Sequence, residues 1–199
     1  MAHPAGWGGV QAPHGGVSHG HPDAARPGTG ADRQGPVTEA YGADLPRVVQ
    51  VCNEALATEI VCVLRYKRHY YTATGIHAEP VAKEFLEHAA DEQRHADMLA
   101  DRIAQLGGQP DFDPARLSTR AHTQYDSSLD LLDMIREDLV AERVAIASYT
   151  EIAQWLGDGD PTTRRVFEQL LADEEDHADD LATMLERLPR PRADGGPVI

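Results

Sequence analysis

Residues 91–97 read DEQRHAD and residues 173–179 read DEEDHAD, and these two stretches decide the fold. Each contains a glutamate three positions before a histidine. Side chains three positions apart on an α-helix project from nearly the same face, so each pair can bind one metal ion. The two stretches therefore predict two helices that carry metal ligands, in the pairs Glu92 with His95 and Glu174 with His177.

A lone glutamate precedes each pair by about one helix length. Glu59 lies in the apolar stretch LATEIVC at 56–62, and Glu142 lies in LVAERVA at 139–145. Glu92 follows Glu59 by 33 residues and Glu174 follows Glu142 by 32, so the chain contains an internal repeat. Four carboxylates balance the charge of two divalent ions, which makes their burial tolerable. Carboxylates with one imidazole per ion favour iron or manganese over structural zinc.

One Glu-x-x-His pair alone has a simpler interpretation. An acidic helical protein contains such pairs by chance, and helices with salt bridges on a solvated face produce similar runs. Two pairs, two lone glutamates on apolar stretches and near-equal spacings together favour a dinuclear site. We therefore predict that six side chains converge to bind two metal ions and carry the chemistry: Glu59, Glu92, His95, Glu142, Glu174 and His177.

Apolar residues recur at spacings of three and four, and turn signals separate the segments, which predicts four long helices. They are expected over about 46–74, about 80–106, from just after Ser127 or Ser128 to 156, and over 161–188. Short connections within each half predict two antiparallel hairpins, whereas the long link at about 108–126 can span the whole bundle. The predicted fold is all-α, an antiparallel four-helix bundle with one long crossover between helices two and three.

The segments on either side of the bundle, which is expected over 44–188, differ from it in composition. Residues 1–43 are rich in glycine and proline and offer little to bury, so we expect a disordered N-terminal arm. Its four histidines could bind metal loosely: His3, His14, His19 and His21. Residues 189–199 are expected to form a short flexible tail.

Charge and composition limit the classes of molecule that the protein is expected to bind. The formal net charge is −15 over 199 residues, which disfavours binding to DNA or to an anionic membrane and favours cations. No apolar run approaches the roughly 20 residues that a membrane-spanning helix needs, and the first ten residues do not resemble a signal peptide. Cys52 and Cys62 stand roughly 15 Å apart along one expected helix, too far for a disulfide within it. We expect a cytoplasmic protein.

Three further residues lie at suggestive spacings from the predicted ligands. Tyr66 and Tyr149 each follow a lone glutamate by seven residues, on the same helix face. Tyr149 is interpreted as a core residue whose hydroxyl is satisfied. For Tyr66, core packing, a hydrogen bond to a metal-binding carboxylate and a role as electron donor are all open. His88 is interpreted as a packing or surface residue, with a supporting role at the site as the alternative.

At these residues the chain resembles the ferritin and bacterioferritin superfamily, over about residues 47–188. The segments around the lone glutamates and the two Glu-x-x-His pairs look like the ligand motifs of bacterioferritin. The resemblance implies that Glu59 and Glu142 are terminal ligands, one per metal. It also implies that Glu92 and Glu174 bridge the two metals, and that each histidine of the pairs binds one ion.

Two departures from bacterioferritin refine the resemblance. Bacterioferritin has a haem-ligating methionine directly after its second-helix glutamate, whereas this chain has Gln93, so no haem is expected. Larger ferritins carry a fifth helix that helps close a shell of twenty-four, whereas only about eleven residues follow Leu188 here. This combination resembles the Dps-like proteins called thioferritins, with a bacterioferritin-type site in each subunit of a cage of twelve. True Dps proteins build their site between subunits from different motifs, so the Glu-x-x-His pairs argue against membership of that branch.

The resemblance implies an iron storage and detoxification protein. Such a protein is a ferroxidase that oxidises Fe(II) with hydrogen peroxide or dioxygen at two iron ions per subunit, with manganese as the alternative metal. The mineral would collect in a homo-oligomeric shell, expected to have 12 subunits. One alternative is a non-storage di-metal oxidoreductase of the same fold, such as a manganese catalase or peroxidase. A non-enzymatic helical scaffold or DNA-coating protein with solvated acidic faces is the other.

Overall fold

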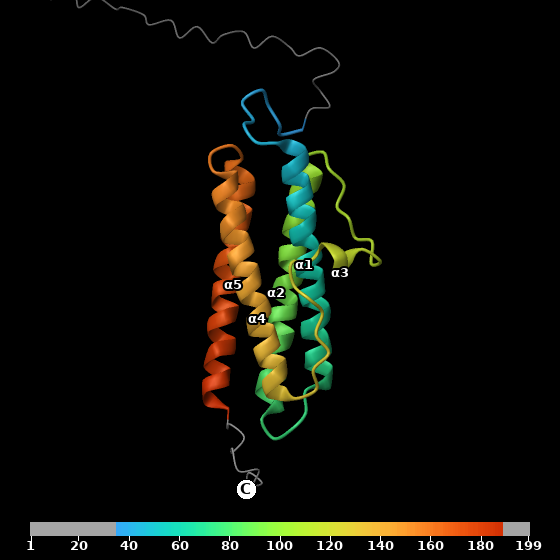
Figure 1. The fold of residues 1–199 in the computed structure, drawn as a ribbon, viewed down its shortest axis with the longest axis vertical. Coiled ribbons are helices and arrows are strands. Elements are labelled where there is room, and N and C mark those ends of the chain that lie inside the picture. Colours follow the sequence, from blue (N-terminus) through green and yellow to red (C-terminus); the bar gives the residue numbers. More distant parts are fainter. Residues whose placement is uncertain (1–34, 189–199) are drawn as a thin grey trace, which may run out of the picture. The chain divides into compact units, whose positions relative to one another are not determined.

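The computed structural model describes residues 35–188, and every regular element within them is a helix (Figure 1). The elements are α1 (Leu45–Thr72), α2 (Ala78–Gln105), α3 (Leu117–Arg120), α4 (Leu131–Leu156) and α5 (Pro161–Arg187). The predicted all-α bundle of four long helices is confirmed. The expected arm up to residue 34 and the expected tail from residue 189 lie outside the described residues.

Aspartates begin three of the four long helices. Asp44, Asp130 and Asp160 each accept a hydrogen bond from a backbone amide in the first turn of α1, α4 and α5, respectively. Such bonds satisfy amides that have no partner within the helix. Because Asp130 is the capping residue, α4 begins at Leu131, a few residues later than expected from Ser127 or Ser128.

The connection from α2 to α4 runs the length of the bundle. Figure 1 shows the chain descending α1, ascending α2, returning along the outside of the bundle, then ascending α4 and descending α5. Helices α1 and α2 form one antiparallel hairpin, α4 and α5 form the other, and α4 runs parallel to α2. This is the predicted topology with one long crossover.

Polar and apolar contacts attach the crossover to α1. The Asn53 side chain accepts a hydrogen bond from the Asp111 backbone amide at 2.7 Å and donates one to the Gln109 carbonyl at 3.2 Å. Leu117, the first residue of α3, packs in a small apolar cluster with Ala57 of α1. The single turn α3 was not predicted, because four residues are too few to show helical periodicity.

Two apolar clusters fill the bundle, one toward each end. Val48, Leu99, Tyr149 and Phe167 belong to the first, and the second includes Phe85 with Met134, Ile135 and Leu181. Along each of the four long helices, the predicted ligands stand between the residues of the first cluster and those of the second. The fold therefore places six polar side chains at the middle of the bundle, between two apolar layers.

Tyr41 lies within the range expected to be a disordered arm, and it contacts the bundle. Its hydroxyl donates a hydrogen bond to Asp160 at 2.9 Å, and Asp160 also pairs with Arg102 at 3.0 Å. Val37 and Tyr41 pack against the first apolar cluster. Among the helices of residues 35–188, none combines the length and the hydropathy that crossing a membrane requires.

Candidate metal centre

The six predicted ligands come together in the interior, one group from each long helix. Glu59 lies on α1, Glu92 and His95 on α2, Glu142 on α4, and Glu174 and His177 on α5. His177 is 5% exposed and the other five side chains are no more than 1% exposed. Four carboxylates in one core are unfavourable unless cations or protons balance them.

These residues form two overlapping groups. The possible ligand atoms of Glu59, Glu92, His95 and Glu174 lie within 4.8 Å of one another, as do those of Glu92, Glu142, Glu174 and His177. Glu92 and Glu174 belong to both groups, whereas Glu59 and Glu142 each belong to one. The geometry therefore offers two adjacent cation positions that share two carboxylates.

Helical spacing accounts for the contacts within each pair. The Nδ1 atom of His95 lies 3.4 Å from a Glu92 oxygen, and Nδ1 of His177 lies 3.4 Å from a Glu174 oxygen. Both pairs have the spacing of three residues that places side chains on one face. Nδ1 of His95 also lies 3.4 Å from Oε2 of Glu59, so helix packing adds the third side chain.

The ligand atoms themselves lack hydrogen-bond partners. Among the described residues, seven buried atoms of these six side chains have none: Oε2 of Glu59, both carboxylate oxygens of Glu92, Nδ1 of His95, Oε2 of Glu142, Oε2 of Glu174 and Nδ1 of His177. Buried polar atoms are rarely left without a partner. Oxygen atoms with one imidazole nitrogen per position suit iron or manganese, so the donor set fits a pair of such cations.

Two tyrosines support the centre across the bundle. The Tyr66 hydroxyl on α1 donates a hydrogen bond to Glu142 on α4, and the Tyr149 hydroxyl on α4 donates one to Glu59 on α1. Burial, followed by the charge of the nearby glutamates, raises the pKa of both phenols well above the ordinary value. Both tyrosines therefore stay protonated and donate. The sequence left this bond open for Tyr66 and did not anticipate that the partner of Tyr149 is a predicted ligand.

A carboxylate faces the outer nitrogen of each histidine, a feature that the sequence analysis missed. Nε2 of His95 on α2 lies 3.0 Å from Asp173 on α5, and Nε2 of His177 on α5 lies 3.5 Å from Asp91 on α2. A carboxylate at Nε2 holds the proton there and leaves Nδ1 free as a ligand. The signal was present, since an aspartate directly precedes the glutamate in both motifs.

Burial and mutual charge perturb the acids of the centre. Burial, then the neighbouring carboxylates, raises the pKa of Glu92 and Glu142 well above the ordinary value. Burial acts in the same direction on Glu174, but hydrogen bonds with His177 and His95 outweigh it and hold the pKa of Glu174 below its usual range. The cluster therefore keeps protons on Glu92 and Glu142 until divalent cations replace them.

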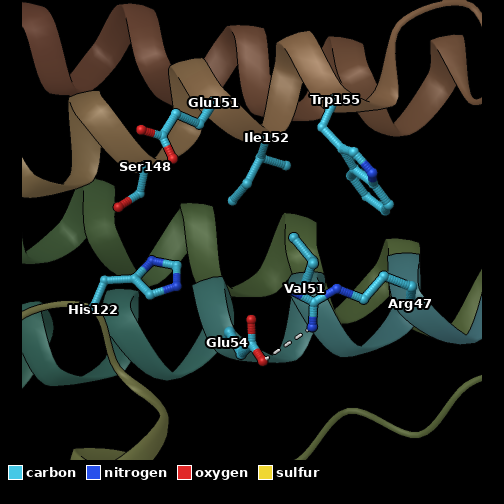
Figure 2. Close-up of a pocket in the computed structure, with 8 residues that line it drawn as sticks. All are labelled: Arg47, Val51, Glu54, His122, Ser148, Glu151, Ile152 and Trp155. Atoms are coloured by element: carbon cyan, nitrogen blue, oxygen red, sulfur yellow. Dashed lines mark ion pairs between the residues drawn. The ribbon is translucent and has the colours of Figure 1, made fainter.

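A surface cavity of about 470 Å³ lies elsewhere, where α1, α4 and the crossover meet (Figure 2). Arg47 pairs with Glu54 along its α1 side at 3.7 Å, and Trp155 closes one end from α4. None of the residues that line it belongs to a cluster of potential metal ligands within the described part of the chain. The cavity is therefore not part of the candidate metal centre.

The ferritin-like domain model matches residues 50–190, a range that contains all six converging side chains and all of the bundle except the first five residues of α1. The chain belongs to the ferritin-like family. Bacterioferritin from Brucella melitensis is 32% identical over 149 residues, which cover 73% of this chain and 86% of that protein. This confirms the resemblance to bacterioferritins that the motifs predicted.

Two solved structures resemble this chain in both sequence and fold. The dodecameric thioferritin from Bacteroides fragilis, a bacterioferritin-related protein, is 33% identical with a TM-score of 0.70, and the match covers 73% of this chain and 88% of that one. Dps from Thermosynechococcus elongatus is 25% identical with a TM-score of 0.68, over 70% of this chain and 90% of that one. The predicted likeness to the Dps-like proteins called thioferritins is therefore confirmed at the level of the fold.

Proposed function

We propose that this ferritin-like protein is a ferroxidase that oxidises Fe(II) to Fe(III) and stores the product. The observation that carries the proposal is the set of seven buried ligand atoms without hydrogen-bond partners. They belong to six side chains arranged as two adjacent cation positions. In the proposed assignment, Glu59 and Glu142 bind one ferrous ion each, Glu92 and Glu174 bridge the ions, and His95 and His177 complete the two positions.

Holding two ferrous ions side by side allows the oxidant to be reduced in one two-electron step. Each Fe(II) loses one electron, hydrogen peroxide accepts both, its O–O bond breaks, and two protons are taken up to give two water molecules. Because both electrons arrive together, no hydroxyl radical is released. Dioxygen is the alternative oxidant, and its two-electron reduction with two protons gives hydrogen peroxide.

The chain's own groups prepare the site for this reaction. Loading the ions displaces the protons of Glu92 and Glu142, because metal-binding carboxylates must be ionised. Asp173 and Asp91 keep the imidazole Nδ1 atoms directed at the ions. The four carboxylates match the charge of two ferrous ions and stabilise the additional positive charge of the ferric product.

The proposal includes a hollow homo-oligomeric shell of 12 subunits. Its support is the identity of 33% to a relative that forms a dodecamer. Apolar side chains such as Trp155 and Val140 on α4 and Leu64 on α1 are about half exposed, which offers area for contacts between subunits. The net charge of −15 would favour the passage of ferrous ions into such a shell.

Further parts of the proposal concern the cofactors and the compartment. Iron is proposed over manganese because the resemblance is to bacterioferritins. Haem is not expected, because Gln93 follows Glu92 and its side-chain amide donates a hydrogen bond to Asp97. Both cysteines of the chain are free and buried, which suits a reducing cytoplasm.

The test combines ferrous oxidation with particle size. Glu92→Gln together with Glu174→Gln should abolish rapid ferrous oxidation, followed by absorbance after addition of peroxide, while the helical circular dichroism is retained. Glu137→Gln, an exposed residue on α4, is the control and should oxidise at the original rate. Unchanged oxidation in the double variant would disprove the assigned site.

Storage is tested separately from oxidation. A particle of twelve subunits that retains iron well above two ions per chain supports the shell and its mineral. A small particle that retains about two ions per chain would instead favour the alternative function, a di-metal catalase or peroxidase of the same fold.

A further inference from the structure

A second group of potential ligands lies beside the six-residue centre, between α2 and α5. Glu84 and His88 on α2 and Asp180 on α5 bring an imidazole nitrogen and two carboxylate oxygens within 4.8 Å of one another. Glu84 and His88 are four residues apart, so α2 presents both on one face. None of the three is a residue of the proposed dinuclear centre.

His88 is the unusual member of this group. It is 2% exposed, and neither of its ring nitrogens has a hydrogen-bond partner. Its Nε2 atom faces the carboxylate of Glu84 and lies 3.5 Å from Oε1. A buried imidazole normally has a partner for its N–H and another for its bare nitrogen. An acidic group alone would be explained by solvation, but a buried imidazole that makes no hydrogen bond and lies beside carboxylates is a candidate cation ligand.

Aromatic packing holds the His88 ring in position. It stacks on the ring of His177 with centroids 4.1 Å apart and planes 23° apart, and the ring of Tyr66 lies edge-on at 5.2 Å. The ring is therefore held between His177 and Tyr66, so a cation at Glu84 and Asp180 would find it already oriented.

The surroundings carry strong negative charge. His88, His177 and Arg94 line a surface cavity of about 200 Å³. Six carboxylates also line it: Glu84, Glu87, Asp91, Asp173, Asp176 and Asp180. Carboxylates at this density attract a divalent cation rather than an anion or an apolar ligand.

We propose that Glu84, His88 and Asp180 form a third divalent-cation site, at the surface cavity that leads to His177. One imidazole nitrogen and two carboxylates suit a first-row transition metal ion with water in its remaining positions. Because His88 stacks directly on His177, an ion in this site lies next to the dinuclear centre. The inference rests on the geometry of these three residues and does not require the ferroxidase proposal.

A competing arrangement would use His88 differently. The ligand atoms of His88, Glu142 and His177 also lie within 4.8 Å of one another, so His88 could bind an ion of the dinuclear centre. In that arrangement the carboxylates of Glu84 and Asp180 would contribute no ligand. The number of ions bound by variants of these two outer residues therefore separates the two possibilities.

Cobalt(II) is a suitable probe, because it accepts nitrogen and oxygen ligands and is not turned over by the ferroxidase reaction, so bound ions can be counted. The full-length assembled protein is dialysed against Co²⁺, and cobalt per chain is measured by elemental analysis. Glu84→Gln with Asp180→Asn should lower the count by one ion per chain. Glu87→Gln with Asp176→Asn removes two charges from the same cavity and should leave the count unchanged. All variants retain the N-terminal histidines, so differences between them decide the result.

Two results would overturn the third site. One is an unchanged count in the Glu84→Gln, Asp180→Asn variant, and the other is an equal loss in the control variant, which would mean diffuse attraction by the acidic cavity. His88→Gln provides a further measurement and should also lower the count by one. Since Asp180 is exposed and Glu84 partly exposed, the first pair of variants decides the question even if His88→Gln fails to fold.

Discussion

Tyr149 on α4 donates a hydrogen bond to Glu59 on α1, and this bond fixes a predicted terminal ligand from across the bundle. Tyr149→Phe removes the donor but keeps the ring, so packing in the core is retained. We expect the dissociation constant for Co²⁺ at the centre to rise by about 10- to 100-fold, the usual cost of losing a group that orients a ligand. Calorimetric titration measures it. The exposed Tyr125→Phe is the control, and an equal affinity in both variants would contradict the assigned role.

Asp173 positions His95 through its outer nitrogen, at 3.0 Å. Asp173→Asn removes the charge that stabilises the proton on Nε2, so the imidazole no longer favours the form with a bare Nδ1. We expect weaker Co²⁺ binding by about 10-fold or more. Asp179→Asn on the exposed face of α5 should bind Co²⁺ as the original protein does. A similar affinity in both would show that Asp173 makes only a surface ion pair with Arg94.

Replacing a terminal glutamate and replacing a bridging glutamate should change the number of bound cations by different amounts. Glu59 belongs to one group of potential ligands, whereas Glu92 belongs to both. Glu59→Gln should therefore bind one Co²⁺ fewer per chain than the original protein. Glu92→Gln should lower the affinity for both ions. Elemental analysis after dialysis distinguishes these results. Equal losses in the two variants would contradict the assignment of Glu59 as terminal and Glu92 as bridging.

The pH dependence of stability should reverse when cations are bound. Folding raises the pKa of Glu92 and Glu142 by burial, so their contribution to the free energy of unfolding is complete below the unfolded value of about 4.3. It is lost as the pH rises through the raised folded pKa values. The carboxylates around His95 raise its pKa against the effect of burial, and this contribution has the same sign.

We therefore expect the Tm of chelator-treated protein to fall as the pH rises above the unfolded pKa of a glutamate, about 4.3. Saturating Mn²⁺ should remove or invert this slope, because cation binding requires ionised carboxylates. Scanning calorimetry at several pH values measures both curves. The Glu92→Gln variant has one fewer ionisable acid and should show a smaller slope without metal. A slope identical in all three samples would refute the assignment.

A buried charge network joins α1 to α4 and to the crossover. Arg65 Nε lies 2.9 Å from Asp138, and Nδ1 of His69 lies 2.9 Å from the other oxygen of the same carboxylate. Arg65 also donates a hydrogen bond to the Gln124 carbonyl of the crossover. Asp138→Asn would leave the arginine without its counter-charge in the interior. We expect the free energy of unfolding to fall by about 3–5 kcal/mol.

Denaturant unfolding of metal-free protein measures this loss. Asp133→Asn is the matched control, because Asp133 lies on the same helix and pairs with Arg136 at the surface. An exposed ion pair contributes only about 0–1 kcal/mol. If both variants unfold at the same denaturant concentration, the buried network does not stabilise the bundle.

Local spacing was sufficient to predict much of this protein. The pairs Glu92 with His95 and Glu174 with His177 follow from the periodicity of one helix, and the helix bounds follow from capping aspartates, prolines and glycines. The internal repeat indicated that Glu59 and Glu142 would join them. These features depend on residues close together in the chain, so they can be found without knowing how the helices pack.

Packing between helices determined the contacts that the sequence did not predict. The bond from Tyr149 to Glu59, the support of His95 by Asp173 and the stacking of His88 on His177 each join two different helices. Their existence depends on the rotation and relative height of neighbouring helices, and helical periodicity contains neither quantity. The amino-acid sequence therefore determined which faces carry the acids and histidines. Only the tertiary structure determined which partner each of them meets.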